Sequence, residues 1–296
     1  MSGLFGWINR RIPNPPRGPT GWLDIPVRRQ VAATLPQYRR GWVQDVEPSK
    51  PILLYRAWYD LLKAYPPYPA QQIGDCVSFG HSHGWDLLQA VEVALGNQET
   101  YNETFTEFMY GASRKVGGIL GNQDGSFGSA AAKAAITIGH VPRTMAYSGQ
   151  TAKSWGYYGP PDELVSQAVK LGGVALIKDW PTLVSALWNG FPVPICSDQG
   201  FAMERDKDGF CAPRGTWNHC MLIAGAQFGR RPGALILQSW GPNVPSGPIG
   251  LDAPDFGFWA DRNVVERILS QGDSFALMNA PELSGPRLLP PDWTRA

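Results

Sequence analysis

The chain has 296 residues with a formal net charge of +1, and 43% of its residues are apolar, including 12 Trp, 12 Phe and 10 Tyr. This length and composition predict a folded protein of one or two domains with an aromatic-rich core. A net charge this close to zero provides no general electrostatic attraction to nucleic acid. The sequence contains no run of 18 apolar residues, the length that would predict a membrane span. We therefore expect no specific nucleic-acid partner and no membrane span.

The first 46 residues differ in composition from the rest of the chain. They hold seven Arg and no Lys against only Asp24 and Asp45, and they contain six prolines, which rule out a long helix. We expect residues 1–46 to form a basic, Pro-rich N-terminal arm. This arm is either a leader or strap that belongs to its own domain, or a docking arm in a larger assembly.

Two features of the sequence bear on the compartment. The N-terminal charges follow a short apolar stretch, whereas a secretory signal places them before a longer one, so we expect no secretion by a signal peptide. The four cysteines are few and scattered, which suits a reducing compartment. The sequence does not decide whether Cys196 and Cys211 form a disulfide.

Apolar residues at helix-like intervals dominate the first half of the chain, and strand-like patterns dominate the second half. Helices are expected over residues 51–63, 76–95, 101–115, 129–138, 162–170 and 181–189. Strands are expected over residues 193–197, 219–224, 234–238 and 256–259. Helices followed by an antiparallel sheet are typical of the α+β class.

Three short motifs supply the groups that a cysteine hydrolase needs. They are Gly74-Asp75-Cys76, Asn218-His219 and Gln238-Ser239-Trp240-Gly241. In chain order they provide a thiol nucleophile, an imidazole base and an amide that can orient the base. His219 follows Cys76 by 143 residues, and Gln238 follows after 19 more, which is the papain-type order and spacing.

The sequence around each motif resembles the papain-like (C1) cysteine peptidases. Residues 73–79 resemble the nucleophile loop of that family and the first turn of its helix, with Gly74 two residues before the Cys and Phe79 three after it. Residues 218–225 resemble its Asn-His-apolar strand ending in Gly. Residues 235–241 resemble its Lys-Asn-Ser-Trp-Gly block, with Gln in place of Asn.

The resemblance covers roughly residues 50–275 and implies a two-lobed fold with the site between the lobes. We expect a papain-like domain over residues 47–280, with a helical lobe at about 47–160 and an antiparallel β lobe at about 161–280. A Pro-rich C-terminal tail is expected over residues 281–296. No inhibitory propeptide of the long helical kind is evident in the sequence.

The resemblance also assigns roles to the motif residues. Cys76 begins a helix, where the dipole and a facing imidazolium would favour its thiolate. His219 would be that imidazole, although a core histidine on a strand would give the same pattern. Gln238 would hold the tautomer of His219, Asn218 would support it, and Trp240 would shield their contact from water, as a plain core Trp would also do.

Two further positions are less sharply defined. The family Gln that donates to the oxyanion lies six residues before the Cys, but that position is Ala70 here. We expect Gln71 to take the role if the loop is one residue shorter, the alternative being that Gln71 and Gln72 are turn residues. We expect Asp75 to cap the helix that follows it, because Asp is a favoured N-cap residue.

The glycine-rich stretch 118–128 lacks the Lys-Ser/Thr of a phosphate loop, and we expect no cofactor. Asp124 and Gly125 occupy the place where the family binds substrate backbone, although an ordinary turn is an equal alternative. His81 and His83 cannot share a helix face with Cys76, so no metal site is expected.

The motifs predict hydrolysis of peptide bonds through a Cys76–His219–Gln238 triad. The substrate would be a peptide or the peptides of peptidoglycan. In showing no signal peptide and no propeptide, the sequence resembles papain-like proteins encoded in bacteriophage genomes. The alternative is therefore a virion-associated structural component, with weak or lost catalysis, that docks through residues 1–46. Either reading predicts a cytoplasmic or virion-associated protein.

Overall fold

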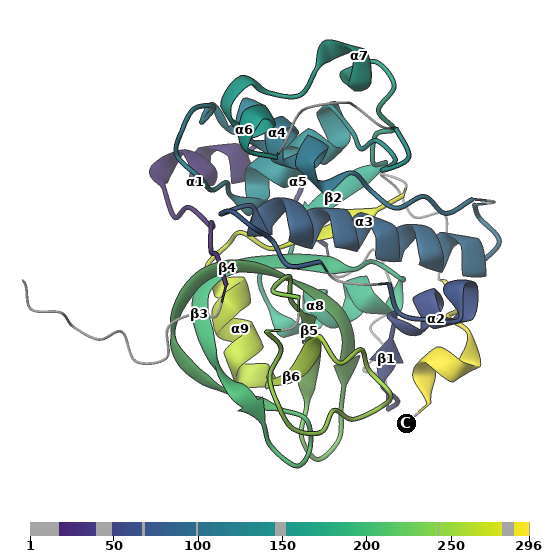
Figure 1. Cartoon of the computed structure of the whole chain (residues 1–296). Coiled ribbons are helices and arrows are strands. Elements are labelled where there is room, and N and C mark those ends of the chain that lie inside the picture. Colours follow the sequence, from purple (N-terminus) through teal and green to yellow (C-terminus); the bar gives the residue numbers. More distant parts are fainter. Residues whose placement is uncertain are drawn as a thin grey trace, which may run out of the picture.

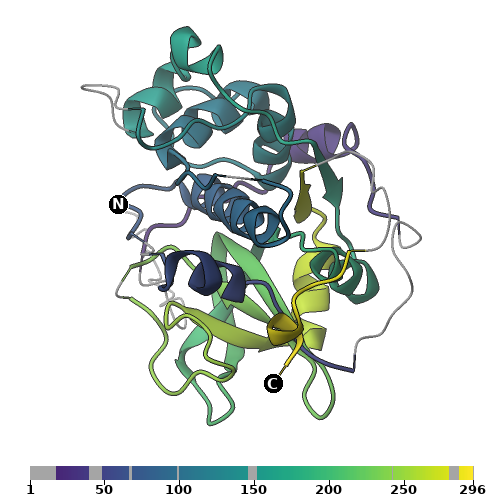
Figure 2. The same ribbon diagram turned by 90° about the vertical axis from the view of Figure 1, so that its right-hand side faces the viewer.

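The computed structural model describes residues 18–39, 49–66, 69–98, 100–145, 152–241, 243–279 and 287–295. Residues 1–17 and 40–46 of the expected arm, and residues 281–286 and 296 of the expected tail, lie outside this part. A helix-rich half and a sheet-rich half lie on either side of the long helix α3 (Cys76–Ala94), as Figures 1 and 2 show from two directions.

Helix α3 confirms the helix predicted over residues 76–95. Almost all of its residues down to Glu92 are buried, because elements of both halves pack around it. It packs directly on strand β4 (Cys211–Gln227), and Gly80 permits this approach: a Cβ at Gly80 would lie 2.8 Å from Sγ of Cys220. The helix that carries Cys76 is therefore held against the strand that carries His219.

Helix α2 (Arg56–Leu62) packs on α3, whereas α6 (Ala152–Tyr158) packs on α4 (Thr106–Gly117), which also lies against α5 (Gly128–Thr137). The short helix α7 (Asp162–Val165) follows α6. Helix α4 begins five residues later than predicted, because Asp86 accepts hydrogen bonds from both N and Oγ1 of Thr104. Helix α7 ends at Val165, earlier than predicted, because Val169 pairs with His140 in an antiparallel bridge.

The sheet of the second half is antiparallel, with strand order β1-β4-β5-β6 and β3 beside β4. Its strands are β1 (Ile52–Leu53), β3 (Val193–Arg205), β4, β5 (Gly233–Leu237) and β6 (Gly257–Asp261). All four predicted strands overlap these, but β3 and β4 are far longer than predicted. The stretch predicted as one helix over 51–63 is strand β1 followed by α2.

Several elements were not predicted. Strands β2 (Gly173–Leu176) and β7 (Phe275–Met278) pair as a second small sheet. Helix α8 (Trp180–Trp188) matches a predicted helix, whereas α1 (Pro26–Ala32), α6, α9 (Arg262–Ser270) and the 3-10 helix η2 (Pro291–Thr294) match none. Of the helices that the structure describes, none has the length and apolar character to cross a membrane.

All four histidines are buried, including His81, which the helix pattern had placed away from the apolar stripe. Neither nitrogen of His81 has a hydrogen-bond partner among the described residues. Burial lowers the pKa of His81 to about 3, so the side chain stays neutral in the folded protein at pH 5 to 7.

Replacement of His81 by Leu should change the pH dependence of stability. Below pH 6.5 the unfolded wild type binds a proton at residue 81 that the folded state does not bind until about pH 3, so the wild type loses stability as pH falls. Between pH 7 and pH 5 the difference in unfolding free energy should move by about 2 kcal/mol in favour of His81→Leu. Urea unfolding at both pH values measures this, with Gln30→Ala, an exposed change, as control. A difference that stays constant with pH would contradict it.

Candidate active site

Cys76 is the first residue of α3 and is fully buried. Burial raises the pKa of its thiol, nearby Cys196 raises it further, and backbone hydrogen bonds from Cys220 and Gly21 offset part of the rise. In this state of the protein the sulfur is therefore a neutral thiol, which is a poor nucleophile.

The expected cap of α3 by the side chain of Asp75 is wrong. The carboxylate makes no capping hydrogen bond, and the backbone of Asp75 (φ −106°, ψ 21°) lies outside the extended region that N-cap residues normally adopt. Its backbone oxygen instead accepts hydrogen bonds from the N–H groups of Ser78 and Phe79. Burial raises the pKa of Asp75 to about 7, so the carboxyl beside the thiol is neutral in about half of the molecules at pH 7.

His219 lies in β4 opposite Ser197 of β3 and is fully buried. Its ring stacks on Trp240, with ring centroids 4.5 Å apart and planes at 24°. Neither imidazole nitrogen has a hydrogen-bond partner within the described part of the chain. Burial lowers the pKa of His219 to about 3, so the imidazole is neutral.

Gln238 follows β5 and does not bond to His219 in this structure. Its Nε2 donates to the backbone oxygen of Asn243 at 2.9 Å, and its Oε1 is buried without a partner among the residues described. No hydrogen bond joins Cys76 to His219 either, since both nitrogens of that ring are unpaired. The three residues of the predicted triad thus lie on α3, on β4 and after β5, and no hydrogen bond among the described residues joins His219 to the other two.

Gln71 lies beside the Ser239-Trp240 block, as a residue of the site would. Its backbone N donates to the oxygen of Ser239 at 3.0 Å, and its Oε1 accepts from Oγ of Ser239 at 2.5 Å. Its Nε2 donates to the oxygen of Ile73 at 3.0 Å. An amide nitrogen carries two hydrogens, so one donor of Gln71 is left over for a ligand.

Residues 18–24 of the chain itself, which we call the strap, lie across the segments that carry the motifs, and we refer to the region they cover as the groove. The N–H of Trp22 donates to the oxygen of Asn218 at 3.0 Å, and Nε1 of Trp240 donates to the oxygen of Pro19 at 2.9 Å. Gly21 passes so close to the nucleophile loop that a Cβ at this position would overlap the carbonyl oxygen of Gly74. The strap thus touches the segments that carry all three motifs.

The strap also pairs with the glycine-rich loop, but through Ser126. Its oxygen accepts from the N–H of Leu23 at 2.8 Å, and its N–H donates to the oxygen of Gly21 at 2.8 Å. The predicted residues Asp124 and Gly125 lie just before it: Asp124 pairs with Lys153, and the N–H of Gly125 donates to the Tyr110 hydroxyl. The loop thus forms backbone hydrogen bonds to an extended segment of the same chain at Ser126.

The side chain of Trp22 is buried in a pocket that the sequence did not reveal. Its Nε1 donates to Oδ2 of Asp273 at 2.8 Å, and this carboxylate also accepts from the N–H groups of Gly128 and Ser129. The guanidinium of Arg28 lies 5.2 Å from the centre of the Trp22 ring. In the sequence, the feature that relates to this packing of Trp22 is the preceding Gly21, whose lack of a side chain lets the strap pass close to Gly74.

Residues 18–39 of the basic arm pack on the chain's own domain, with Ser129 Oγ donating to the oxygen of Arg28 and α1 lying against α5. Within residues 18–39 the only helix is α1, so this part of the arm contains no long helical propeptide.

All four cysteines are free. Cys196 lies opposite Cys220 across β3 and β4, whereas Cys211 lies opposite Arg205, so the bridge that the sequence left open is not formed. Within the described residues no group of three or more His, Cys, Asp or Glu side chains could hold a metal ion.

Solved structures with the same arrangement settle the fold. Xylellain, a cysteine protease from Xylella fastidiosa, is 17% identical, with a TM-score of 0.59 over 90% of this chain and 98% of that chain. ProCathepsin B S9 from Trypanosoma congolense is 8% identical, with a TM-score of 0.57 over 90% and 87%. The bromelain protease from Ananas comosus, in complex with the E64 inhibitor, is 12% identical, with a TM-score of 0.51 over 77% and 98%.

The fold is papain-like. This confirms the predicted α+β class. No protein-family model matches the sequence, and no curated protein matches it. Because identities below a fifth establish the fold alone, the activity of this papain-like domain has to be argued from its own residues.

Displacement of the strap should expose Cys76. In Gly21→Ala the new Cβ collides with the backbone of Gly74, so the strap leaves the groove, water enters, and the pKa of the thiol falls. We expect alkylation of Cys76 by iodoacetamide at pH 7 to become at least about tenfold faster, because each unit of pKa multiplies the thiolate about tenfold. Mass spectrometry of the labelled peptide measures the rate.

The same experiment carries its own controls. Gln30→Ala changes an exposed residue of α1 and should leave the rate unchanged. The three other buried cysteines should stay unlabelled in every variant. An unchanged rate at Cys76 in folded Gly21→Ala would show that the strap does not protect the thiol.

Proposed function

We propose that this protein is a cysteine peptidase that hydrolyses peptide bonds and that the strap holds it in a latent state. The observation that carries the proposal is the strap itself. An extended peptide lies along the groove beside Cys76 and is bound through its backbone by Asn218 and Ser126. A groove that binds one peptide in this way can bind another, and recognition through the backbone suits a peptidase.

The charge state of the site supports latency. Burial beneath the strap favours the neutral form of both Cys76 and His219, since it raises the pKa of the first and lowers that of the second. When the strap leaves, solvent removes much of this penalty, and proton transfer from thiol to imidazole gives the reactive pair. Removal of the strap thus opens the groove and activates the nucleophile.

In the reaction the Cys76 thiolate attacks the carbonyl carbon of the scissile bond and forms a thioester as the amine leaves. His219 donates its proton to that amine, and then takes a proton from the water that hydrolyses the thioester. The N–H of Cys76 and the second N–H of the Gln71 amide supply donors for the oxyanion. Gln238 orients His219.

The two unpaired buried groups support the role of Gln238. Oε1 of Gln238 is an acceptor without a donor, and His219 carries an N–H without an acceptor. Leaving such groups unpaired when buried costs roughly 1–3 kcal/mol each. A rotation of the Gln238 side chain that joins them on release of the strap would remove both costs, with Trp240 covering the bond.

A second candidate function is a structural component of a phage particle with weak or lost catalysis. The observation that favours it is the absence of hydrogen bonds from Cys76 and Gln238 to His219 among the described residues. On this candidate the protein is virion-associated and docks through residues 1–46, and peptidoglycan peptides would be the substrate of any remaining activity.

Labelling with E64, a thiol-directed epoxide, tests the peptidase. Gly21→Ala protein should form a covalent adduct at Cys76 and cleave an unstructured protein substrate. The additional change Cys76→Ala should abolish both, and His219→Ala should slow both by about 10²-fold or more, because the general base is lost. Mass spectrometry and release of new amino termini give the two readouts.

The outcome separates the two candidates. If Gly21→Ala protein reacts with iodoacetamide at Cys76 but neither reacts with E64 nor cleaves protein, the thiol is exposed without catalysis, and the structural candidate gains. If wild type is already as active as Gly21→Ala, the peptidase stands and latency fails.

A further inference from the structure

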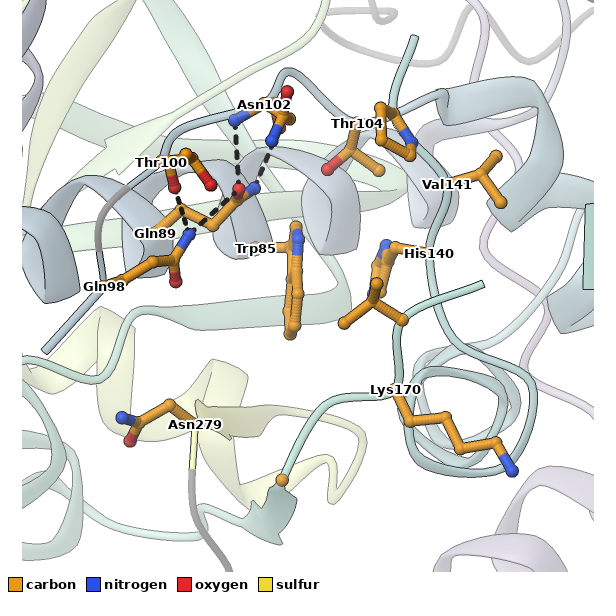
Figure 3. Close-up of a pocket in the computed structure, with 13 residues that line it drawn as sticks. Trp85, Gln89, Gln98, Thr100, Asn102, Thr104, His140, Val141, Lys170 and Asn279 are labelled. Atoms are coloured by element: carbon orange, nitrogen blue, oxygen red, sulfur yellow. Dashed lines mark hydrogen bonds between the residues drawn. The ribbon is translucent and has the colours of Figure 1, made fainter. Parts of the chain in front are cut away.

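A second cavity of about 340 Å³ opens beside the far half of α3. Residues from α3, from the loops around 98–104, 140–142 and 169–172, and Asn279 line it (Figure 3). None of them belongs to the groove: Trp85 and Gln89 lie nine and thirteen residues after Cys76, which is roughly 13–20 Å along the helix. The volume is at the lower end of the range of small-ligand sites, which is about 300–1,000 Å³.

One wall of this cavity is an aromatic platform. The rings of Trp85 and His140 are stacked, with centroids 4.8 Å apart and planes at 9°. In Figure 3 the indole of Trp85 is seen edge-on, with His140 on one side and Gln98 and Asn279 on the other. One face of the half-buried indole is therefore covered by the imidazole, and the opposite face is turned to the cavity.

The polar groups around this platform are almost all uncharged. They are the amides of Gln89, Gln98, Asn102 and Asn279 and the hydroxyls of Thr100 and Thr104, and Lys170 is the one charged residue among those that line the cavity. The Gln89 amide is fixed by two bonds to the backbone of Asn102, donating to its oxygen at 2.9 Å and accepting from its N–H at 3.1 Å. Nδ2 of Asn279 donates to Glu92 at 2.8 Å.

His140 adds an unsatisfied group to this wall. It is 3% exposed, and neither of its ring nitrogens has a partner among the described residues. Burial lowers its pKa to about 3, so it is a neutral ring with one donor and one acceptor. Both nitrogens are buried, so His140 serves this wall through its ring, which covers one face of Trp85.

We propose that this cavity binds a neutral sugar ring. The C–H face of a sugar carries partial positive charge and packs on the negative face of an indole, here Trp85. Its hydroxyls both donate and accept, as the surrounding amides do. A phosphate or carboxylate ligand would need more positive charge than the single Lys170 provides. This proposal does not depend on the peptidase activity.

Titration of the full-length protein with trisaccharides of glucose and of N-acetylglucosamine tests the site, followed by ligand-observed NMR and calorimetry. We expect at least one of the two to bind with a Kd below about 1 mM. Trp85→Ala should weaken binding about tenfold through loss of stacking, and Gln98→Ala, a change at a half-buried residue of the rim, should weaken it several-fold. Tyr158→Ala, which removes an aromatic ring that is 77% exposed and does not line the cavity, should have no effect.

Two parallel titrations, with adenosine and with a neutral tripeptide, test for a different ligand. If either of these binds and neither trisaccharide does, the proposal is overturned. So does sugar binding that is unchanged in Gln98→Ala and in folded Trp85→Ala. Because the Gln98 change removes no core contact, a failure of the Trp85 variant to fold leaves the test decisive.

Discussion

The close contact of α3 with β4 determines where every other part of the site can be. At Gly80 the helix approaches Cys220 so closely that no side chain fits between them. Cys76 begins that helix one turn earlier, and His219 precedes Cys220 on the strand. The relative position of Cys76 and His219 is thus set by packing of buried backbone, although no hydrogen bond joins the two side chains.

The same burial that fixes the positions of Cys76 and His219 opposes the ionisation of their side chains. A thiolate and an imidazolium are both charged, and removal of water disfavours each of them. The strap completes this removal because it closes the groove with its backbone, with Trp22 anchored on Asp273 and Trp240 bonded to Pro19. Position of the groups and their ionisation are therefore controlled separately: the fold sets the first, and the occupant of the groove sets the second.

Local signals predicted the helix and strands that carry the motifs. The apolar repeat from Cys76 to Leu95 and the Asn218-His219 strand are properties of short stretches, and the structure has both elements. The β2–β7 sheet joins segments about a hundred residues apart, and Trp22 meets Asp273 across 251 residues. No short pattern encodes such contacts, so the strap and its pocket could not be predicted.

The errors within the site have the same origin. The residue type of Asp75 suggested a cap, but its backbone angles lie outside the extended region and its side chain makes no capping hydrogen bond. The sequence identified the loop around Gly125. It did not identify Ser126 as the residue that pairs with the strap, because the register of this pairing is defined only in the folded loop. The identity of Gln238 gave its chemistry, and its rotamer is chosen by Asn243.

Because the strap and the groove belong to one chain, their association is a unimolecular equilibrium. A tethered segment competes at an effective local concentration that dilution of the protein does not change. A single cut of the chain between the strap and α2 would end that advantage. The released piece would then bind as an ordinary ligand, whose occupancy falls with its bulk concentration, so one proteolytic event would convert a permanent block into a dissociable one.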